Sequence, residues 1–134
     1  MTGDIVLDTS YLLAVVMGDE ATPAQASKVM AARLLAPAIW PLEVANTFLV
    51  NQRRGRINAE QLQRLVEVVA ALDVQVAATP SLSVEHWCQF ATAHGLTPYD
   101  AQYLDLALQQ RCGIATCDAR LAQAAARAGV PVFS

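Results

Sequence analysis

The chain has 134 residues, of which 54% are hydrophobic and 16% are charged. A chain of this length and hydrophobicity can build its own core, so we expect a single domain over residues 1–134 and no disorder. The net charge of −3 argues against broad nucleic-acid binding, although a bound cation would offset the charge of an acidic cluster.

The sequence also argues against a membrane or secreted protein. No apolar run approaches the length that spans a bilayer, and residues 1–4 have no basic segment of the kind that begins a signal peptide. The three cysteines form no Cys-x-x-Cys pair and only two histidines are present, so we expect no zinc site. Free thiols in a reducing cytoplasm are the plain interpretation.

Short apolar runs alternate along the chain with longer segments whose apolar residues recur at helical spacing. In chain order the pattern predicts a strand at 5–7, helices at 10–16 and 23–33, a strand at 34–38, helices at 41–53 and 58–72, a strand at 74–76, helices at 80–94 and 97–112, a strand at 114–116, a helix at 118–129 and a strand at 131–133. Strands that alternate with helices in this way predict a three-layer α/β/α domain with a mainly parallel sheet.

Residues at helix starts support two of these helices. Pro41 suits a first helical position because its missing N–H is not needed there, and Asn58 is a good N-cap. The spacing predicts core-facing stripes on both helices: Leu42, Ala45, Phe48 and Leu49 on the first, and Leu62, Leu65, Val66, Val69 and Leu72 on the second.

Four carboxylates lie where a predicted helix begins, just after a strand or loop: Asp8, Glu43, Asp100 and Asp118. In a parallel α/β fold such positions gather at one edge of the sheet. Four acids there would offer the hard oxygen ligands that suit a divalent cation. The sequence therefore predicts a candidate metal-dependent active site.

Each acid taken singly also has a structural explanation. Aspartate and glutamate in the first turn of a helix accept free N–H groups, so Asp118 could be only an N-cap and Asp100 could belong to a capping arrangement with Thr97. The conjunction favours a shared site. Glu43 lies among apolar residues with no lysine or arginine nearby in sequence, and burying an unpaired carboxylate is costly.

Two further features have competing interpretations. Asp105 lies five residues after Asp100, so it should turn away from that face as a solvated or interface acid, while Leu104 and Leu108 face the core. A basic turn could hold RNA phosphates or an acidic partner, or could only complement the end of a helix. Its arginines are Arg53, Arg54 and Arg56.

Four segments of the chain together resemble the PIN-domain ribonucleases, and most closely the toxin subunits of VapBC toxin–antitoxin pairs. The segments are Val6-Leu7-Asp8-Thr9-Ser10, Pro41-Leu42-Glu43-Val44-Ala45-Asn46, Tyr99-Asp100-Ala101-Gln102-Tyr103-Leu104 and Thr116-Cys117-Asp118-Ala119-Arg120-Leu121. Their order, spacing and flanking apolar residues agree with that family over essentially the whole chain.

The resemblance implies a PIN-like fold with a five-stranded, mainly parallel sheet, and an endoribonuclease that uses Mg²⁺ or Mn²⁺. Asp8 and Asp100 would be direct ligands, whereas Glu43 and Asp118 would bind through water or hold a second ion. Four neighbouring polar residues would orient ligands or water: Thr9, Ser10, Asn46 and Thr116. A water activated by the metal would attack the RNA phosphodiester.

The resemblance also implies partners: an RNA substrate, a VapB-type antitoxin, and a second copy of the chain in a homodimer. Four aromatic residues could line a groove for an antitoxin peptide, or could belong to the core: Tyr11, Trp40, Phe48 and Trp87. Neither His86 nor His94 lies in an acidic segment, which disfavours metal-free cleavage by paired histidines. The alternative function is a PIN-like module that binds RNA or protein without cutting.

Overall fold

The computed structural model describes residues 3–18, 21–78 and 81–134, and its centre is a parallel sheet. Its five strands are β1 (Ile5–Leu7), β2 (Leu34–Ala36), β3 (Gln75–Val76), β4 (Gly113–Ala115) and β5 (Val132–Phe133). They lie in the order β3-β2-β1-β4-β5, and every neighbouring pair is parallel. The prediction of a five-stranded, mainly parallel sheet is confirmed, and the sheet is wholly parallel.

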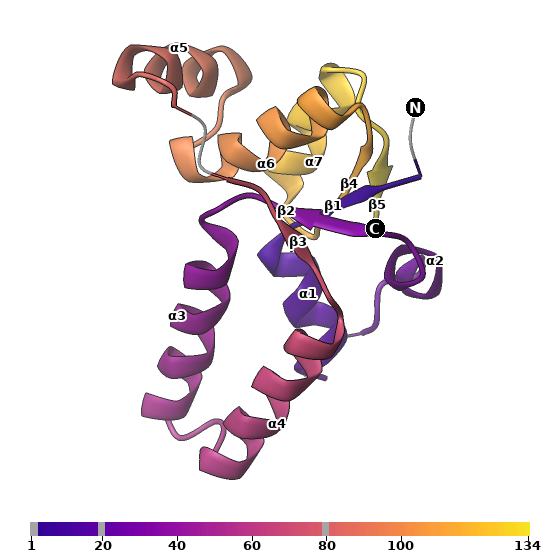
Figure 1. Ribbon diagram of the computed structural model, residues 1–134, viewed down its shortest axis with the longest axis vertical. Coiled ribbons are helices and arrows are strands. Elements are labelled where there is room, and N and C mark those ends of the chain that lie inside the picture. Colours follow the sequence, from indigo (N-terminus) through magenta and orange to yellow (C-terminus); the bar gives the residue numbers. More distant parts are fainter. Residues whose placement is uncertain (1–2, 19–20, 79–80) are drawn as a thin grey trace.

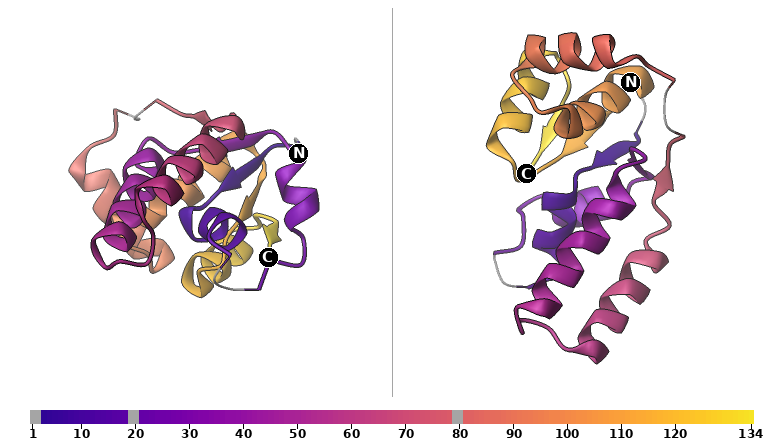
Figure 2. Two further views of the ribbon diagram at one scale, coloured as in Figure 1. Left: turned by 90° about the horizontal axis from the view of Figure 1, so that it is seen from below. Right: turned by 90° about the vertical axis from the view of Figure 1, so that its left-hand side faces the viewer.

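Seven helices occur in the described residues: α1 (Thr9–Val16), α2 (Ala26–Met30), α3 (Trp40–Arg53), α4 (Ala59–Ala71), α5 (Val84–His94), α6 (Pro98–Gln110) and α7 (Ala119–Arg127). Figure 1 shows α1, α3 and α4 below the sheet and α6 and α7 above it. The hairpin of α3 and α4 extends away from the sheet, as the right view of Figure 2 also shows. The predicted three-layer arrangement is therefore confirmed.

Strands in the middle of the sheet are buried because helices cover both faces. Every residue of β1, β2 and β4 is buried, which agrees with their continuous apolar sequences. The helices begin where local capping was expected. Asn58 and Gln61 form a reciprocal capping box at the start of α4, and the Thr97 hydroxyl accepts a hydrogen bond from the Asp100 N–H at the start of α6.

The boundaries of several elements differ from those predicted. The helix expected over 23–33 is only α2, five residues long, and the strand expected to reach residue 38 ends at Ala36. Pro80, the expected start of the fifth helix, lies outside the described residues, and α5 begins after Ser83, whose hydroxyl caps it. Asp19 and Glu20, in the predicted break after the first helix, also lie outside the described residues.

The predicted core face of α3 is partly wrong. Phe48 is buried as expected, but Leu42 is 68% exposed, Leu49 is 40% exposed and Ala45 is also exposed. The buried residues of α3 instead follow a neighbouring stripe that includes Val44 and Phe48. Both stripes carry apolar residues, so helical spacing alone did not show which of them faces the sheet.

The hairpin helix α4 packs only lightly on the rest of the domain. None of its residues is buried, and Val66, predicted to face the core, is 47% exposed. Leu62, Leu65 and Val69 are partly buried against the core, as expected.

Among the described residues, no helix combines the length and the apolar composition that crossing a membrane requires.

The strand order also locates the place where a ligand site can form. Chain connections run from β1 outward to β2 and β3 on one side, and from β4 outward to β5 on the other. The carboxyl ends of β1 and β4 therefore lie side by side where the winding direction reverses. In open parallel sheets, ligands bind in the crevice that this reversal leaves.

Candidate active site

The four predicted site residues come from four different elements that meet at the carboxyl edge of the sheet. Asp8 directly follows β1, and Asp118 follows β4 as the N-cap of α7. Glu43 lies in the first turn of α3, and Asp100 lies in the first turn of α6. Asp8 is buried, and the other three acids are partly exposed.

The charges of these acids act on one another. Burial, and then the negative charges of Asp118, Asp8 and Glu43, together raise the pKa of Asp100 from 3.8 to about 6. Burial also raises the pKa of Asp8, and the charge of Asp118 acts in the same direction. Because charges interact strongly only at short range, the structure brings the four acids together.

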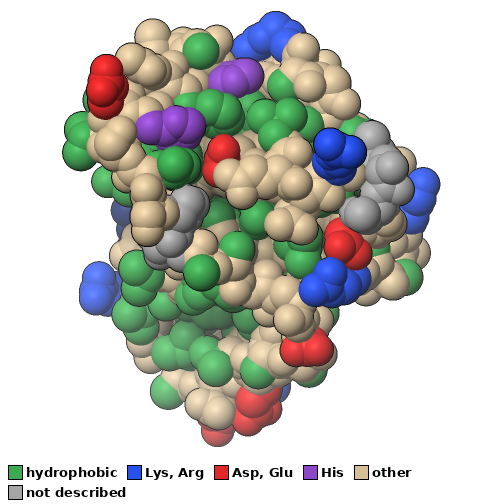
Figure 3. Space-filling model, turned by 45° about the horizontal axis from the view of Figure 1, so that its top comes forward, with side chains coloured by type: hydrophobic (Ala, Val, Ile, Leu, Met, Phe, Trp, Pro, Cys, Tyr) green, Lys and Arg blue, Asp and Glu red, His purple; other side chains and the backbone are tan. Residues whose placement is uncertain are grey.

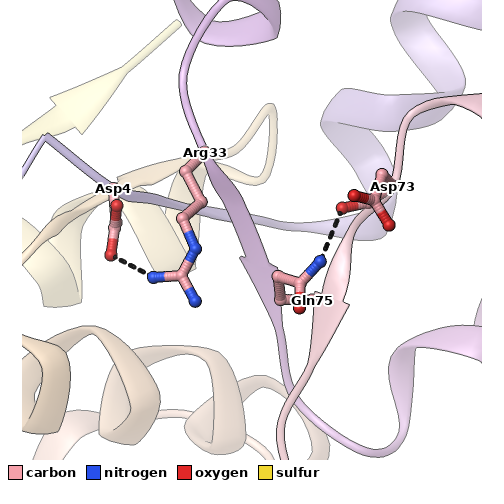
Figure 4. A network of polar contacts seen from close by, with 4 residues as sticks. All are labelled: Asp4, Arg33, Asp73 and Gln75. Atoms are coloured by element: carbon pink, nitrogen blue, oxygen red, sulfur yellow. Dashed lines mark hydrogen bonds and ion pairs between the residues drawn. The ribbon is translucent and has the colours of Figure 1, made fainter.

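No basic side chain pairs with these acids in the part of the chain that the structure describes. The ion pair found there joins Arg33 to Asp4, with 3.0 Å between Nη1 and Oδ2. Both residues precede their strands, so this pair lies at the amino edge of the sheet, where Figure 4 shows it. The four acids at the carboxyl edge therefore keep their combined negative charge.

Hydroxyl groups hold the Asp8 carboxylate in place. Ser10 Oγ donates to Asp8 Oδ2 at 2.6 Å, and Thr116 Oγ1 donates to the same oxygen at 2.7 Å. The Asp118 N–H donates to Thr116 Oγ1, and the Cys117 N–H donates to Ser10 Oγ, so the start of α1 and the end of β4 are tied together. Asp8 occupies the N-cap position of α1, but its side chain makes no capping hydrogen bond.

The Glu43 carboxylate is held by two other hydroxyls. Tyr103, on α6, donates a short hydrogen bond to Glu43 Oε1, and Thr9 Oγ1 donates to the same oxygen at 3.4 Å. Thr9 Oγ1 and Tyr103 Oη are themselves 3.0 Å apart. Burial, and then the hydrogen bond to Glu43, raises the pKa of Tyr103 far above its usual range, so its hydroxyl stays protonated as a donor.

The capping explanation applies to Asp118 through its side chain and to Asp100 through its backbone N–H. Asp118 Oδ1 accepts hydrogen bonds from the backbone N–H groups of Arg120 and Leu121, so this residue is an N-cap. The Asp100 N–H donates to Thr97 Oγ1 at the start of α6. A hydrogen bond between the Thr97 and Asp100 side chains lowers the pKa of Asp100, but burial and the neighbouring acids raise it by more.

Of the four polar residues predicted to orient the site, three contact an acid and one does not. Thr9, Ser10 and Thr116 each contact a candidate acid through a hydroxyl group. Asn46 is exposed on α3, and its side chain makes no hydrogen bond with the described residues. The contribution of Tyr103 was missed, although its spacing of three residues from Asp100 places both on one face of α6.

The donor set suits a hard divalent cation. Within the described residues, no three His, Cys, Asp or Glu side chains stand arranged as a group that could hold a metal ion. Magnesium does not need such a cage, because it usually keeps several waters and takes only one or two carboxylates. Unpaired carboxylate oxygens are the ligands that it prefers, so the residues present fit this cation.

Asp105 lies apart from the four acids, but it is not solvated as predicted. Its exposed fraction is 9%, and Oδ2 accepts a hydrogen bond from Gln109. It lines a cavity of about 240 Å³ together with Trp87 and Pro37. Leu104 is buried as expected, whereas Leu108 is 37% exposed, because the core-facing surface of α6 includes Asp105 instead.

The aromatic residues proposed for a peptide groove mostly belong to the core. Tyr11, Trp40 and Phe48 are buried, and only Trp87 of these four lines surface cavities.

The two histidines lie on one face of the molecule, where Figure 3 shows them in purple. Their rings pack on Phe90, with centroid distances of 5.7 Å for His86 and 4.6 Å for His94.

The comparison with known families agrees with this architecture. The profile of the PIN domain family matches residues 5–127, so the chain belongs to the PIN domain family. PIN domains are typically nucleases, and they generally use divalent metals. No curated protein sequence matches this chain.

Two solved structures show the same fold. The structure of PAE2754 from Pyrobaculum aerophilum superposes with a TM-score of 0.70 at 24% sequence identity, covering 92% of this chain and 87% of the other. The structure of FitAcB from Neisseria gonorrhoeae superposes with a TM-score of 0.65 at 20% identity, covering 97% of this chain and 96% of the other. At these identities the likeness establishes the fold.

The raised pKa of Asp100 predicts a pH-dependent stability in the absence of metal. Between pH 3.8 and about 6, the unfolded chain has lost this proton while the folded protein still keeps it. Raising the pH through that window therefore lowers the free energy of unfolding. In EDTA, Asp100→Asn should melt above wild type at pH 7, and the difference should shrink as the pH falls to 5.

Thermal melts at several pH values measure this difference, with Asp73→Asn as a control acid distant from the site. If the difference in melting temperature between Asp100→Asn and wild type stayed constant from pH 7 to pH 5, the pKa of Asp100 would not be raised in the folded protein.

Proposed function

We propose that this PIN domain is a Mg²⁺- or Mn²⁺-dependent endoribonuclease and the toxin component of a toxin–antitoxin pair. The single observation that supports the proposal best is the coupled set of four carboxylates without a basic partner in the described residues. The resemblance of the four acidic segments to VapBC toxins supports the toxin role. The proposed metal-site residues are Asp8, Glu43, Asp100 and Asp118.

In this proposal the four acids take different roles, according to the hydrogen bonds that each carboxylate already makes. At Asp100 the charges of the other three acids outweigh the hydrogen bond from Thr97, and one oxygen of Asp8 is free of the hydroxyls that hold the other. These two residues are the proposed direct ligands. Glu43 and Asp118 each use one oxygen within the fold, so they are placed to hold water or a second ion with the other.

A divalent cation, when bound, supplies Lewis acidity that acidifies water and offsets charge on a phosphodiester. The chain supplies the rest. Ser10 and Thr116 fix the orientation of Asp8, and Tyr103 and Thr9 fix that of Glu43. Because these donors are hydroxyl groups, they orient the carboxylates without neutralising the charge that holds the cation.

We assign the smaller of two neighbouring cavities to a bound RNA strand. A cavity of about 420 Å³ is lined by Ser10, Cys117, Asn51 and Arg56 and by none of the four acids. Ser10 donates a hydrogen bond to Asp8, and Cys117 precedes Asp118 in the chain, so the cavity lies near the site, and Arg56 gives it a positive charge. It continues into a larger cavity of about 650 Å³ that Arg56 also lines. Of the three arginines in the basic turn, Arg56 lines both cavities, whereas Arg53 and Arg54 line neither.

Exposed apolar side chains support the proposed protein partners. The larger cavity has an apolar wall that includes Val16, Leu65 and Val68, and we assign it to an amphipathic segment of a VapB-type antitoxin. Leu42 and Leu49 on α3 are exposed apolar residues of the kind that a homodimer would bury.

Cleavage of RNA should require both the metal and the proposed ligands. Purified protein should cleave RNA with Mg²⁺ or Mn²⁺, and EDTA should abolish cleavage. Asp8→Asn and Asp100→Asn should each lower kcat by more than about 100-fold, since losing a residue that only orients a metal ligand typically costs 10–100-fold. The assay is steady-state cleavage of labelled RNA at saturating RNA.

Asp105→Asn is the matched control, because it removes a carboxylate from α6 outside the coupled set, and it should keep wild-type kcat. RNA binding without metal-dependent cleavage by wild type would favour the non-cleaving module. Expressed alone in bacteria, wild type should slow growth while Asp100→Asn should not, and equal growth inhibition by both would contradict the toxin role.

Arg56 should contribute to RNA binding more than its two neighbours. Arg56→Gln should raise KM and reduce the slope of log affinity against log salt by about 1, because one phosphate contact is lost. Its kcat at saturating RNA should stay near wild type. Arg53→Gln is the control. An equal rise in KM for both variants would contradict the assignment of the RNA strand to the cavity that Arg56 lines.

A further inference from the structure

Tyr103 joins two layers of the domain at the candidate site. It is fully buried on α6, above the sheet, and its hydroxyl donates to Glu43 on α3, below the sheet. Asp100 lies one helical turn before Tyr103, so α6 places an acid and a hydroxyl on the same face. The hydrogen bond therefore ties Glu43 to the helix that carries Asp100.

The direction of the hydrogen bonds follows from the chemistry of the groups. A tyrosine hydroxyl has one hydrogen, and Tyr103 uses it toward the Glu43 carboxylate. The single hydrogen of the Thr9 hydroxyl is then shared between Tyr103 Oη at 3.0 Å and Glu43 Oε1 at 3.4 Å. Both hydroxyls therefore act on Glu43 Oε1, which leaves Oε2 without a hydrogen bond from the described residues.

We propose that Tyr103 is a positioning residue for the metal site: its hydroxyl holds one Glu43 oxygen so that the other faces the space shared with Asp8 and Asp100. This inference rests on the proposed function, because it assigns Glu43 to a cation-binding set. Carboxylate ligands are commonly oriented by hydrogen bonds of this kind, and losing such a partner typically weakens metal binding about 10–100-fold.

The chain contains a matched control for this hydroxyl. Tyr11 is also a fully buried tyrosine, but its hydroxyl has no hydrogen-bond partner in the described residues. Tyr103→Phe and Tyr11→Phe therefore remove the same atom from two fully buried positions, and only the first removal frees Glu43. A general effect of deleting a buried hydroxyl would appear in both variants.

Direct Mn²⁺ binding, measured from the electron paramagnetic resonance signal of free Mn²⁺, tests the inference without relying on cleavage. Tyr103→Phe should raise the Kd for Mn²⁺ by roughly 10-fold, and Tyr11→Phe should leave it within about twofold. Thr9→Val, which removes the other hydroxyl beside Glu43, should shift the Kd in the same direction by less. If Tyr103→Phe does not fold, Thr9→Val still tests the hydrogen bonds that hold Glu43.

A double-mutant cycle separates positioning from a general structural role. In a Glu43→Gln background, Tyr103→Phe should cause no further loss of Mn²⁺ affinity, because its target is already gone. Melts in EDTA should show both tyrosine variants folded. The same loss of affinity with and without Glu43, or equal affinity of the two tyrosine variants, would overturn the inference while leaving the proposed function intact. A wild type that binds no Mn²⁺ would overturn both.

Discussion

Repulsion among four carboxylates is the constraint on which the rest of the site depends. The parallel sheet and the reversal of winding between β1 and β4 bring Asp8 and Asp118 to one edge, and the first turns of α3 and α6 bring Glu43 and Asp100. Burial and mutual repulsion raise the pKa of Asp100 to about 6. A fold that maintains this arrangement gives up stability locally, as functional sites often do.

The donors that stabilise these acids are neutral. Ser10 and Thr116 hold Asp8, and Thr9 and Tyr103 hold Glu43. A lysine or arginine in any of these positions would relieve the repulsion, but it would also compete with a cation for the carboxylates. Hydroxyl groups orient the oxygens and leave their charge in place, which is what the proposed cation site requires.

Much of this arrangement could be predicted from the sequence because its signals are local. Short apolar runs followed by Asp8 and Asp118 mark strand ends, and Pro41 and Thr97 mark the helices that carry the other two acids. The predictions that were wrong concern features that depend on tertiary packing. Leu42 and Leu49 belong to one of two apolar stripes on α3, and only the packed domain shows that the other stripe faces the sheet. Asp105 was expected in solvent or at an interface, and the same packing places it among the buried residues of α6. Tyr103 contacts a residue sixty positions away, which no local pattern encodes.

The most direct test of a shared cation site is anomalous X-ray diffraction from crystals of the protein soaked with Mn²⁺. One strong anomalous peak bounded by the carboxylates of Asp8 and Asp100, with Glu43 and Asp118 beside it, is the predicted result. A second peak within the same four acids would also agree, since two ions can share such a site. No peak at saturating Mn²⁺, or a peak away from these four residues, would contradict the account.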